Sequence, residues 1–95
     1  MNVKLIRLTS GEDIVANLIS ENDDSIIIEN AIVAVPSGRG ELGFAPWSPL
    51  LSKNVKELTI SKNFVIYVSE TQDQIVEQYS EIFSPIITPS KTLAL

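Results

Sequence analysis

The segment Ser25–Val35 (SIIIENAIVAV) constrains the fold of this chain more than any other part of the sequence. Its β-branched residues favour an extended strand. Alternate placement makes both faces of that strand apolar, one with Ile26, Ile28, Ile32 and Ala34 and the other with Ile27, Ala31, Val33 and Val35. A strand with two apolar faces is covered on both sides, and eleven residues is long for a strand. We therefore expect a long central strand that bends and serves two parts of a curled sheet.

Shorter strand-like segments surround this central strand. They are Val3–Leu8, Asp13–Ser20, Glu41–Leu51, Lys56–Ile60 and Phe64–Ser69. Pro46 and Pro49 cannot donate a backbone hydrogen bond, so their segment is predicted to lie at an edge or a bulge. After Thr71 the apolar residues recur with helical spacing, which predicts an amphipathic helix over about 72–83. An apolar tail, residues 86–95, is expected to lie against the domain or a neighbour.

Together these segments predict a mainly β protein: a strongly bent, five-stranded antiparallel sheet, or half-open barrel, followed by a C-terminal α-helix. Sequential strands joined by short turns favour antiparallel neighbours. No repeat or linker divides the 95 residues, so we expect a single domain over 1–95 with its strands within 3–69. A domain this small has a limited core. The hydrophobic content of 44% therefore also indicates apolar surface shared between identical subunits.

Several kinds of chemistry are not expected from this composition. The chain contains no histidine and no cysteine. Without histidine the commonest general base is missing, and without cysteine there is no disulfide and no thiolate zinc site. Asp23 and Asp24 are typical hairpin residues, and their surroundings lack the alternating ligands of a calcium loop. We expect no enzyme, no catalytic residues, no metal and no cofactor.

Location and charge limit the partners. No secretory signal is visible, and no apolar run approaches the roughly 20 residues needed to cross a bilayer. We therefore expect a cytoplasmic protein without a membrane partner. Twelve acidic residues against seven basic ones give a net charge of −5. This acidity opposes general binding to a phosphate backbone, but a local site that uses stacking and hydrogen bonds stays open.

The stretch Phe44–Pro49 (FAPWSP) is the most unusual in the chain. Its Trp47 is either a core or subunit-interface anchor or an exposed platform for stacking, since Trp is enriched at interfaces and single-stranded bases stack on aromatic rings. Arg39 stands at the tip of the predicted turn 36–40 and can reach a partner. We select Arg39, Phe44 and Trp47 as a candidate interaction surface.

Two stretches carry a resemblance to a known family. Residues 3–35 combine an apolar strand, a turn at Gly11, a second strand with Leu18, an acidic turn at Asp23–Asp24 and a long third strand. Residues 60–69 (ISKNFVIYVS) combine an apolar residue, a short polar turn and a closing apolar strand. These stretches resemble the first and second motifs of the Sm-like (LSm) family. The whole chain is similar to small Sm-like proteins of tailed phages of cyanobacteria, in which case the cytoplasm is that of the host cell.

The resemblance implies the Sm-like fold and a homo-oligomeric ring of about five to seven subunits, closed by pairing of strand edges. Members that bind uridine-rich RNA use an Asn in the third strand and an Arg-Gly in the second motif. Here Ile26 or Ile27 takes the first position and Ser61–Lys62 replaces the second. Lys62 and Asn63 occupy the matching loop and are the candidate RNA-binding residues. Two hypotheses stay open: a ring that binds single-stranded RNA, and a protein-interaction or structural ring without a nucleic-acid role.

Overall fold

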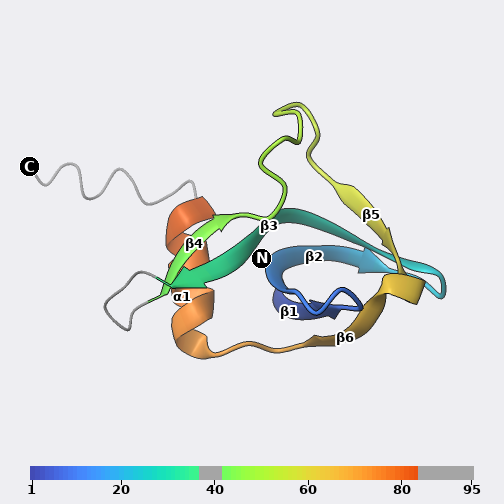
Figure 1. Cartoon of the computed structure of the whole chain (residues 1–95), viewed down its shortest axis with the longest axis horizontal. Coiled ribbons are helices and arrows are strands. Elements are labelled where there is room, and N and C mark those ends of the chain that lie inside the picture. The colour runs from blue at the N-terminus through green and yellow to red at the C-terminus, as the bar shows by residue number, and fades with distance from the viewer. Residues whose placement is uncertain (37–41, 84–95) are drawn as a thin grey trace, which may run out of the picture.

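The computed structural model describes residues 1–36 and 42–83. It contains a mainly β fold followed by one helix, as predicted (Figure 1). The predicted tail at 86–95 and Arg39 lie outside the described residues. The elements are β1 (Val3–Leu8), β2 (Asp13–Glu21), β3 (Ser25–Pro36), β4 (Leu42–Pro46), β5 (Leu58–Ser61), the 3₁₀ turn η1 (Lys62–Phe64), β6 (Val65–Ser69) and α1 (Asp73–Phe83).

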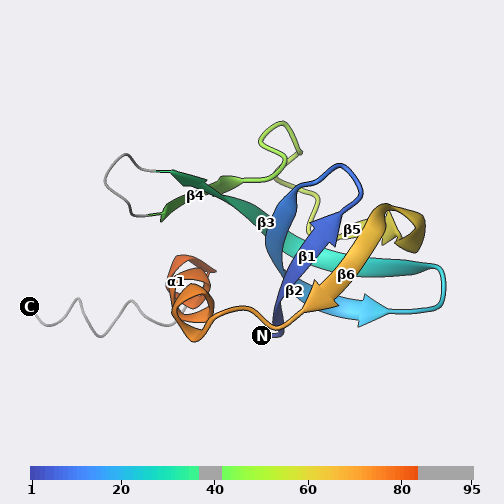
Figure 2. The same cartoon turned by 60° about the horizontal axis from the view of Figure 1, so that its bottom comes forward.

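All strand pairs are antiparallel and belong to one sheet in the order β4-β3-β2-β1-β6, with β5 also paired to β3. The sheet curls strongly, but it does not close into a barrel (Figures 1 and 2). The long strand β3 serves two parts of it, because its first half pairs with β5 and its second half pairs with β4. The antiparallel sheet with a C-terminal helix is thus confirmed.

The number of strands differs from the predicted five. The described residues form six strands, one in each of the six strand-like segments of the sequence, and residues 47–57 leave the sheet between β4 and β5. Pro46 ends β4 and Pro49 follows within the loop. Each proline removes a backbone donor, so the ladder on β3 cannot continue through this stretch.

Asn30 creates the bend in β3 and changes which side chains face inward. Its φ of 54° lies in the left-handed region, which Asn tolerates better than most residues. The pairing with β2 slips here, since Val15 faces Ile32 whereas Asn17 faces Glu29. This extra residue is a β-bulge, and it reverses the alternation of side chains beyond it.

The predicted face assignment of β3 is therefore wrong past Asn30. Ile26 and Ile28 lie in the same cluster as Ala31 and Val33, whereas Ile32 belongs to the opposite face. A strict two-residue period cannot anticipate a bulge, and one inserted residue exchanges the two faces.

Two apolar clusters, one on each face of the sheet, hold the fold together. The inner cluster fills the curl of the sheet with Ile6, Leu8, Ile14, Ala16, Ile26 and Ile28. The outer cluster lies between the sheet and α1 and contains Val3, Val15, Ile32 and Tyr79. Figure 2 shows α1 beside β3 and β4, away from β6. The inner cluster covers one face of β3 and the outer cluster with α1 covers the other, which explains why both faces of this strand are apolar.

Tyr79 fastens α1 to the bulge of β3. Its side chain is fully buried, and its hydroxyl accepts a hydrogen bond from the Asn17 backbone amide at 3.0 Å. The same oxygen lies 2.9 Å from the Asn30 carbonyl and 3.2 Å from the Glu29 carbonyl, to which it donates. The bulge removes regular ladder partners from these groups, and the Tyr79 hydroxyl replaces them. Burial raises the pKa of Tyr79 to about 12, although the Asn17 amide opposes this shift.

Candidate functional site

The three-residue turn η1 joins β5 to β6, two strands that each have one strand partner in the described residues (Figure 1). The Ser61 hydroxyl accepts a hydrogen bond from the Asn63 amide at 3.2 Å, which caps the turn. The Lys62 amide donates to the Asp24 carbonyl at 2.8 Å, and the Phe64 carbonyl accepts from the Thr9 amide at 2.9 Å. The turn is thus tied to the β2–β3 turn on one side and to the β1–β2 turn on the other.

The candidate RNA-binding residues Lys62 and Asn63 lie together in η1, next to the β2–β3 turn. The Lys62 ammonium pairs with the Glu21 carboxylate at 2.9 Å. Glu21 is the last residue of β2, and Asp23 and Asp24 lie in the turn that follows it. The local charge is therefore negative, and Lys62 has a partner within its own chain. Such a partner has to be displaced or bridged before the ammonium can meet a phosphate.

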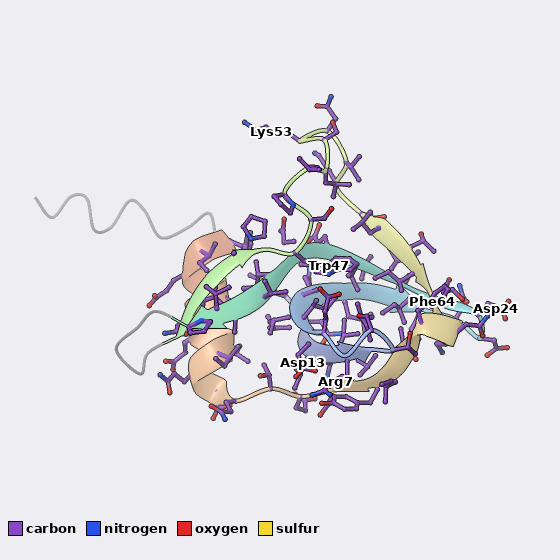
Figure 3. The ribbon with its side chains drawn as sticks, in the orientation of Figure 1. Arg7, Asp13, Asp24, Trp47, Lys53 and Phe64 are labelled. Carbon is purple, nitrogen blue, oxygen red and sulfur yellow. The ribbon has the colours of Figure 1, made fainter. Side chains whose placement is uncertain are left out.

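Phe64 is a surface aromatic residue that the sequence interpretation did not select. Its side chain is 59% exposed and follows Lys62 and Asn63 directly (Figure 3). The spacing of apolar residues predicted it as the start of the last strand, but the structure places it in η1, before β6 begins at Val65. Exposed aromatic rings beside a basic residue are typical of single-strand stacking sites and also of protein interfaces.

Two strand edges without a partner extend from η1 in the described residues. β5 pairs with β3 alone, and β6 pairs with β1 alone. The β6 side also exposes Ile66 and Tyr67. An uncovered edge offers a row of backbone donors and acceptors to another strand.

Trp47 and Phe44 are both half-buried, and they contact different clusters. Trp47 packs against the inner cluster, and its indole nitrogen donates to a Glu12 carboxylate oxygen at 3.3 Å. Its backbone amide donates to the Ala31 carbonyl at 3.0 Å. Phe44 packs against the outer cluster beside α1. Within the single chain, Trp47 is therefore an anchor of the inner cluster. Arg39, the third residue of the predicted interaction surface, lies outside the described residues.

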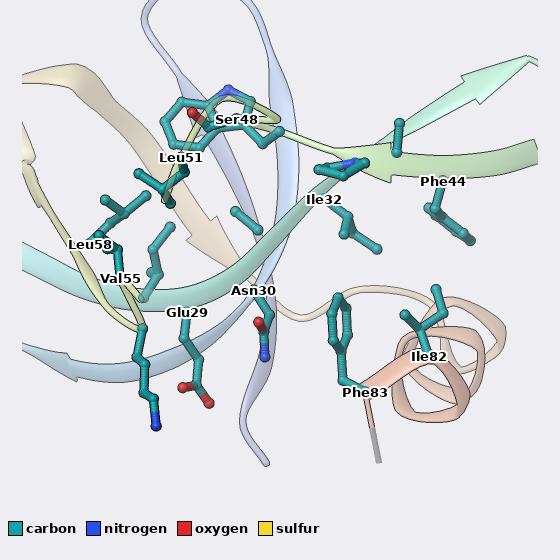
Figure 4. Close-up of a pocket in the computed structure, with 16 residues that line it drawn as sticks. Glu29, Asn30, Ile32, Phe44, Ser48, Leu51, Val55, Leu58, Ile82 and Phe83 are labelled. Atoms are coloured by element: carbon teal, nitrogen blue, oxygen red, sulfur yellow. The ribbon is translucent and has the colours of Figure 1, made fainter. Parts of the chain in front are cut away.

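Phe44 and Trp47 nevertheless line one hollow of about 330 Å³ at the bend of β3 (Figure 4). The aromatic and aliphatic side chains of β4 and the end of α1 form one wall, and those of the loop 47–57 and β5 form the other. Glu29, Asn30 and Lys56 add polar groups to the lining. The Glu29 carboxylate accepts a hydrogen bond from the Asn17 side-chain amide at 2.7 Å. The hollow can thus take an apolar group, with one carboxylate and one ammonium in its lining.

Residues 1–36 and 42–83 contain no group of three acidic side chains that could hold a metal ion. α1 is eleven residues long, and no helix in the described part of the chain is long and apolar enough to span a membrane. Neither a protein-family model nor a curated protein matches this chain.

Proposed function

We propose that this chain is an Sm-like subunit that assembles into a closed ring of about five to seven identical copies by pairing β5 of one copy with β6 of the next. The observation that carries this proposal is the pair of uncovered edges that meet at η1. The order β6-β1-β2-β3, with the next strand again on β3, supports the family resemblance of the sequence.

The contact between copies is heterologous, because two different surfaces of the same chain meet. A heterologous contact repeats from copy to copy and forms a ring when its rotation closes. Natural proteins protect isolated edges with charge, proline or a covering segment. Instead, β6 carries exposed apolar residues at Ile66 and Tyr67. Burial of these side chains against a neighbour supplies the driving force for assembly.

Assembly is tested by placing a charge on the β6 edge. We expect light scattering to give a mass of several chains for the unchanged protein and of one chain for Ile66→Lys, because a buried unpaired ammonium opposes strand addition. Ile19→Lys is the matched control, since Ile19 is a 42% exposed isoleucine on β2, between β1 and β3. A monomeric unchanged protein would contradict the proposed ring.

A second candidate function is the binding of single-stranded RNA by the ring. The exposed Phe64 ring next to Lys62 and Asn63 favours it, because aromatic residues stack on bases without reading sequence. In a ring of subunits, repetition of this turn would bring several Phe64 side chains and Lys62 ammonium groups close together. The acidic β2–β3 turn works against it, and without RNA binding the ring remains a protein-interaction or structural assembly.

RNA binding is tested by fluorescence polarisation with oligo-U at low salt. If RNA binds, Phe64→Ala is expected to weaken binding by about tenfold or more, since each stacked base contributes roughly 1–3 kcal/mol. Lys62→Ala is expected to weaken it and to reduce its salt dependence. The absence of binding at micromolar protein would exclude this candidate and leave the ring without a nucleic-acid role.

A further inference from the structure

The loop that joins β4 to β5, residues 47–57, exposes the most solvent-accessible large apolar side chain of the described residues. Leu50 is 96% exposed, and Leu51 and Val55 are also exposed. Figure 1 shows this loop standing away from the sheet, and Figure 3 shows Lys53 at its far end. The domain itself therefore does not cover Leu50. Burial of an apolar side chain is favourable, and the Leu50 side chain at this loop tip can be buried only when another molecule covers it.

The loop is continuous with the β5 edge that we propose as an assembly surface. It leaves the sheet after Pro46 and re-enters it at Leu58, the first residue of β5. A strand added to the outer edge of β5 therefore comes close to the loop at the Leu58 end. The chain segment that continues from the added strand runs past residues 47–57.

Strand pairing alone gives a small contact. β5 has four residues, which span about 13 Å at roughly 3.3 Å per residue. A stable interface buries on the order of 800 Å² per partner, much more than four paired residues provide. The contact between copies therefore needs additional surface, and the exposed apolar side chains of the loop are adjacent to it.

Charge favours one orientation of the added copy. Lys53 and Lys56 precede β5, with Glu57 between Lys56 and the first residue of the strand, whereas Glu70 and Asp73 follow β6. Every strand pair in this sheet is antiparallel. Antiparallel pairing of β5 with β6 of another copy places the start of β5 opposite the end of β6. The two lysines then face the two carboxylates, and Glu70 remains exposed although it also pairs with Lys4 of its own chain at 2.6 Å.

We infer that loop 47–57 is a second interface element that docks on the end of β6 and the β6–α1 junction, residues 67–73, of the next copy. Its apolar side chains cover the exposed Tyr67 ring, and its lysines face Glu70 and Asp73. This inference rests on the proposed ring, since the neighbour reaches the loop by pairing with β5. The occupant is thus a second copy of this chain.

The apolar half of the contact is tested with Leu50→Ser/Leu51→Ser in a dilution series followed by analytical ultracentrifugation. We expect the dissociation constant between copies to rise by about tenfold to a hundredfold, because two leucines lose burial. Ile19→Ser is the matched control and should leave the constant unchanged. Thermal melting of each variant verifies folding, because Leu50 is 96% exposed whereas Leu51 also lines the hollow at the bend of β3.

The charged half is tested by reversal. Lys56→Glu should weaken association, and Lys56→Glu combined with Asp73→Lys should restore most of it. If the leucine variant and the unchanged protein have the same dissociation constant between copies, the loop contact is overturned while the ring stands. Equal weakening by Ile19→Ser would also overturn it, because the effect would not belong to the loop. An unchanged protein that is monomeric at all concentrations would overturn the ring and the loop contact together.

Discussion

Replacing Ile28 by alanine is expected to lower the free energy of unfolding by about 2–5 kcal/mol. Ile28 is fully buried in the inner cluster and pairs with Leu18 of β2 and Leu58 of β5. The truncation leaves a cavity where both neighbouring strands meet β3, and close-packed interiors relax only partly around such a cavity. The total stability of a small domain is about 5–15 kcal/mol, so the variant loses a large share of it. Urea titration followed by circular dichroism measures the difference.

Ile27→Ala is the matched control, because it removes the same atoms from the adjacent residue. Ile27 is half-buried on the other face of β3 and pairs with Thr59. Its truncation should cost clearly less. Equal losses for the two variants would contradict the assignment of Ile28 to the closed interior of the sheet.

Raising the pH through 10 to 12 is expected to destabilise the fold by about 2–3 kcal/mol through Tyr79 alone. The pKa of an unfolded tyrosine is near 10, and burial raises the pKa of Tyr79 to about 12. Below pH 10 both states hold the proton, and the stabilisation is complete. Between pH 10 and 12 the unfolded state releases the proton while the folded state retains it, so stability falls by about 1.4 kcal/mol per pH unit.

Tyr79→Phe isolates this effect, because it removes the Tyr79 hydroxyl and keeps the aromatic ring. At neutral pH the variant should lose about 1–3 kcal/mol, because the half-buried Asn17 amide and the carbonyls at the bulge lose their partner. Its stability should then fall less steeply above pH 10 than that of the unchanged protein. Parallel curves for the two proteins in thermal melts from pH 8 to 12 would show that Tyr79 does not retain its proton in the fold.

Much of the architecture could be predicted because local patterns determine it. The length and two apolar faces of β3 predicted that one strand serves two parts of a curled sheet, and this is confirmed. The change of period after Thr71 predicted the helix, which begins at Asp73. These features depend on neighbouring residues and on burial, and both determine the spacing of apolar residues along the sequence.

The remainder depends on contacts between distant residues. The bulge at Asn30 requires the Tyr79 hydroxyl, which lies 49 residues away in sequence. The ion pair of Lys62 with Glu21 joins two turns that no local pattern connects. The exposure of Phe64 is linked to η1, which extends one residue beyond the predicted polar turn and so includes Phe64, the residue predicted to begin the last strand. A single sequence therefore identified the turn with Lys62 and Asn63, but not the charge and aromatic surface around it.

The shortness of η1 has a geometric consequence for any assembly. The outer edges of β5 and β6 are separated by a rigid turn of three residues, which is held by hydrogen bonds to Asp24 and Thr9. The angle between the two edges is therefore set by this turn, and in the proposed ring the same angle would relate each copy to the next. The subunit number would then be the number of such rotations that complete a full circle. A residue inserted into η1 would alter this angle and, with it, the stoichiometry of the proposed ring.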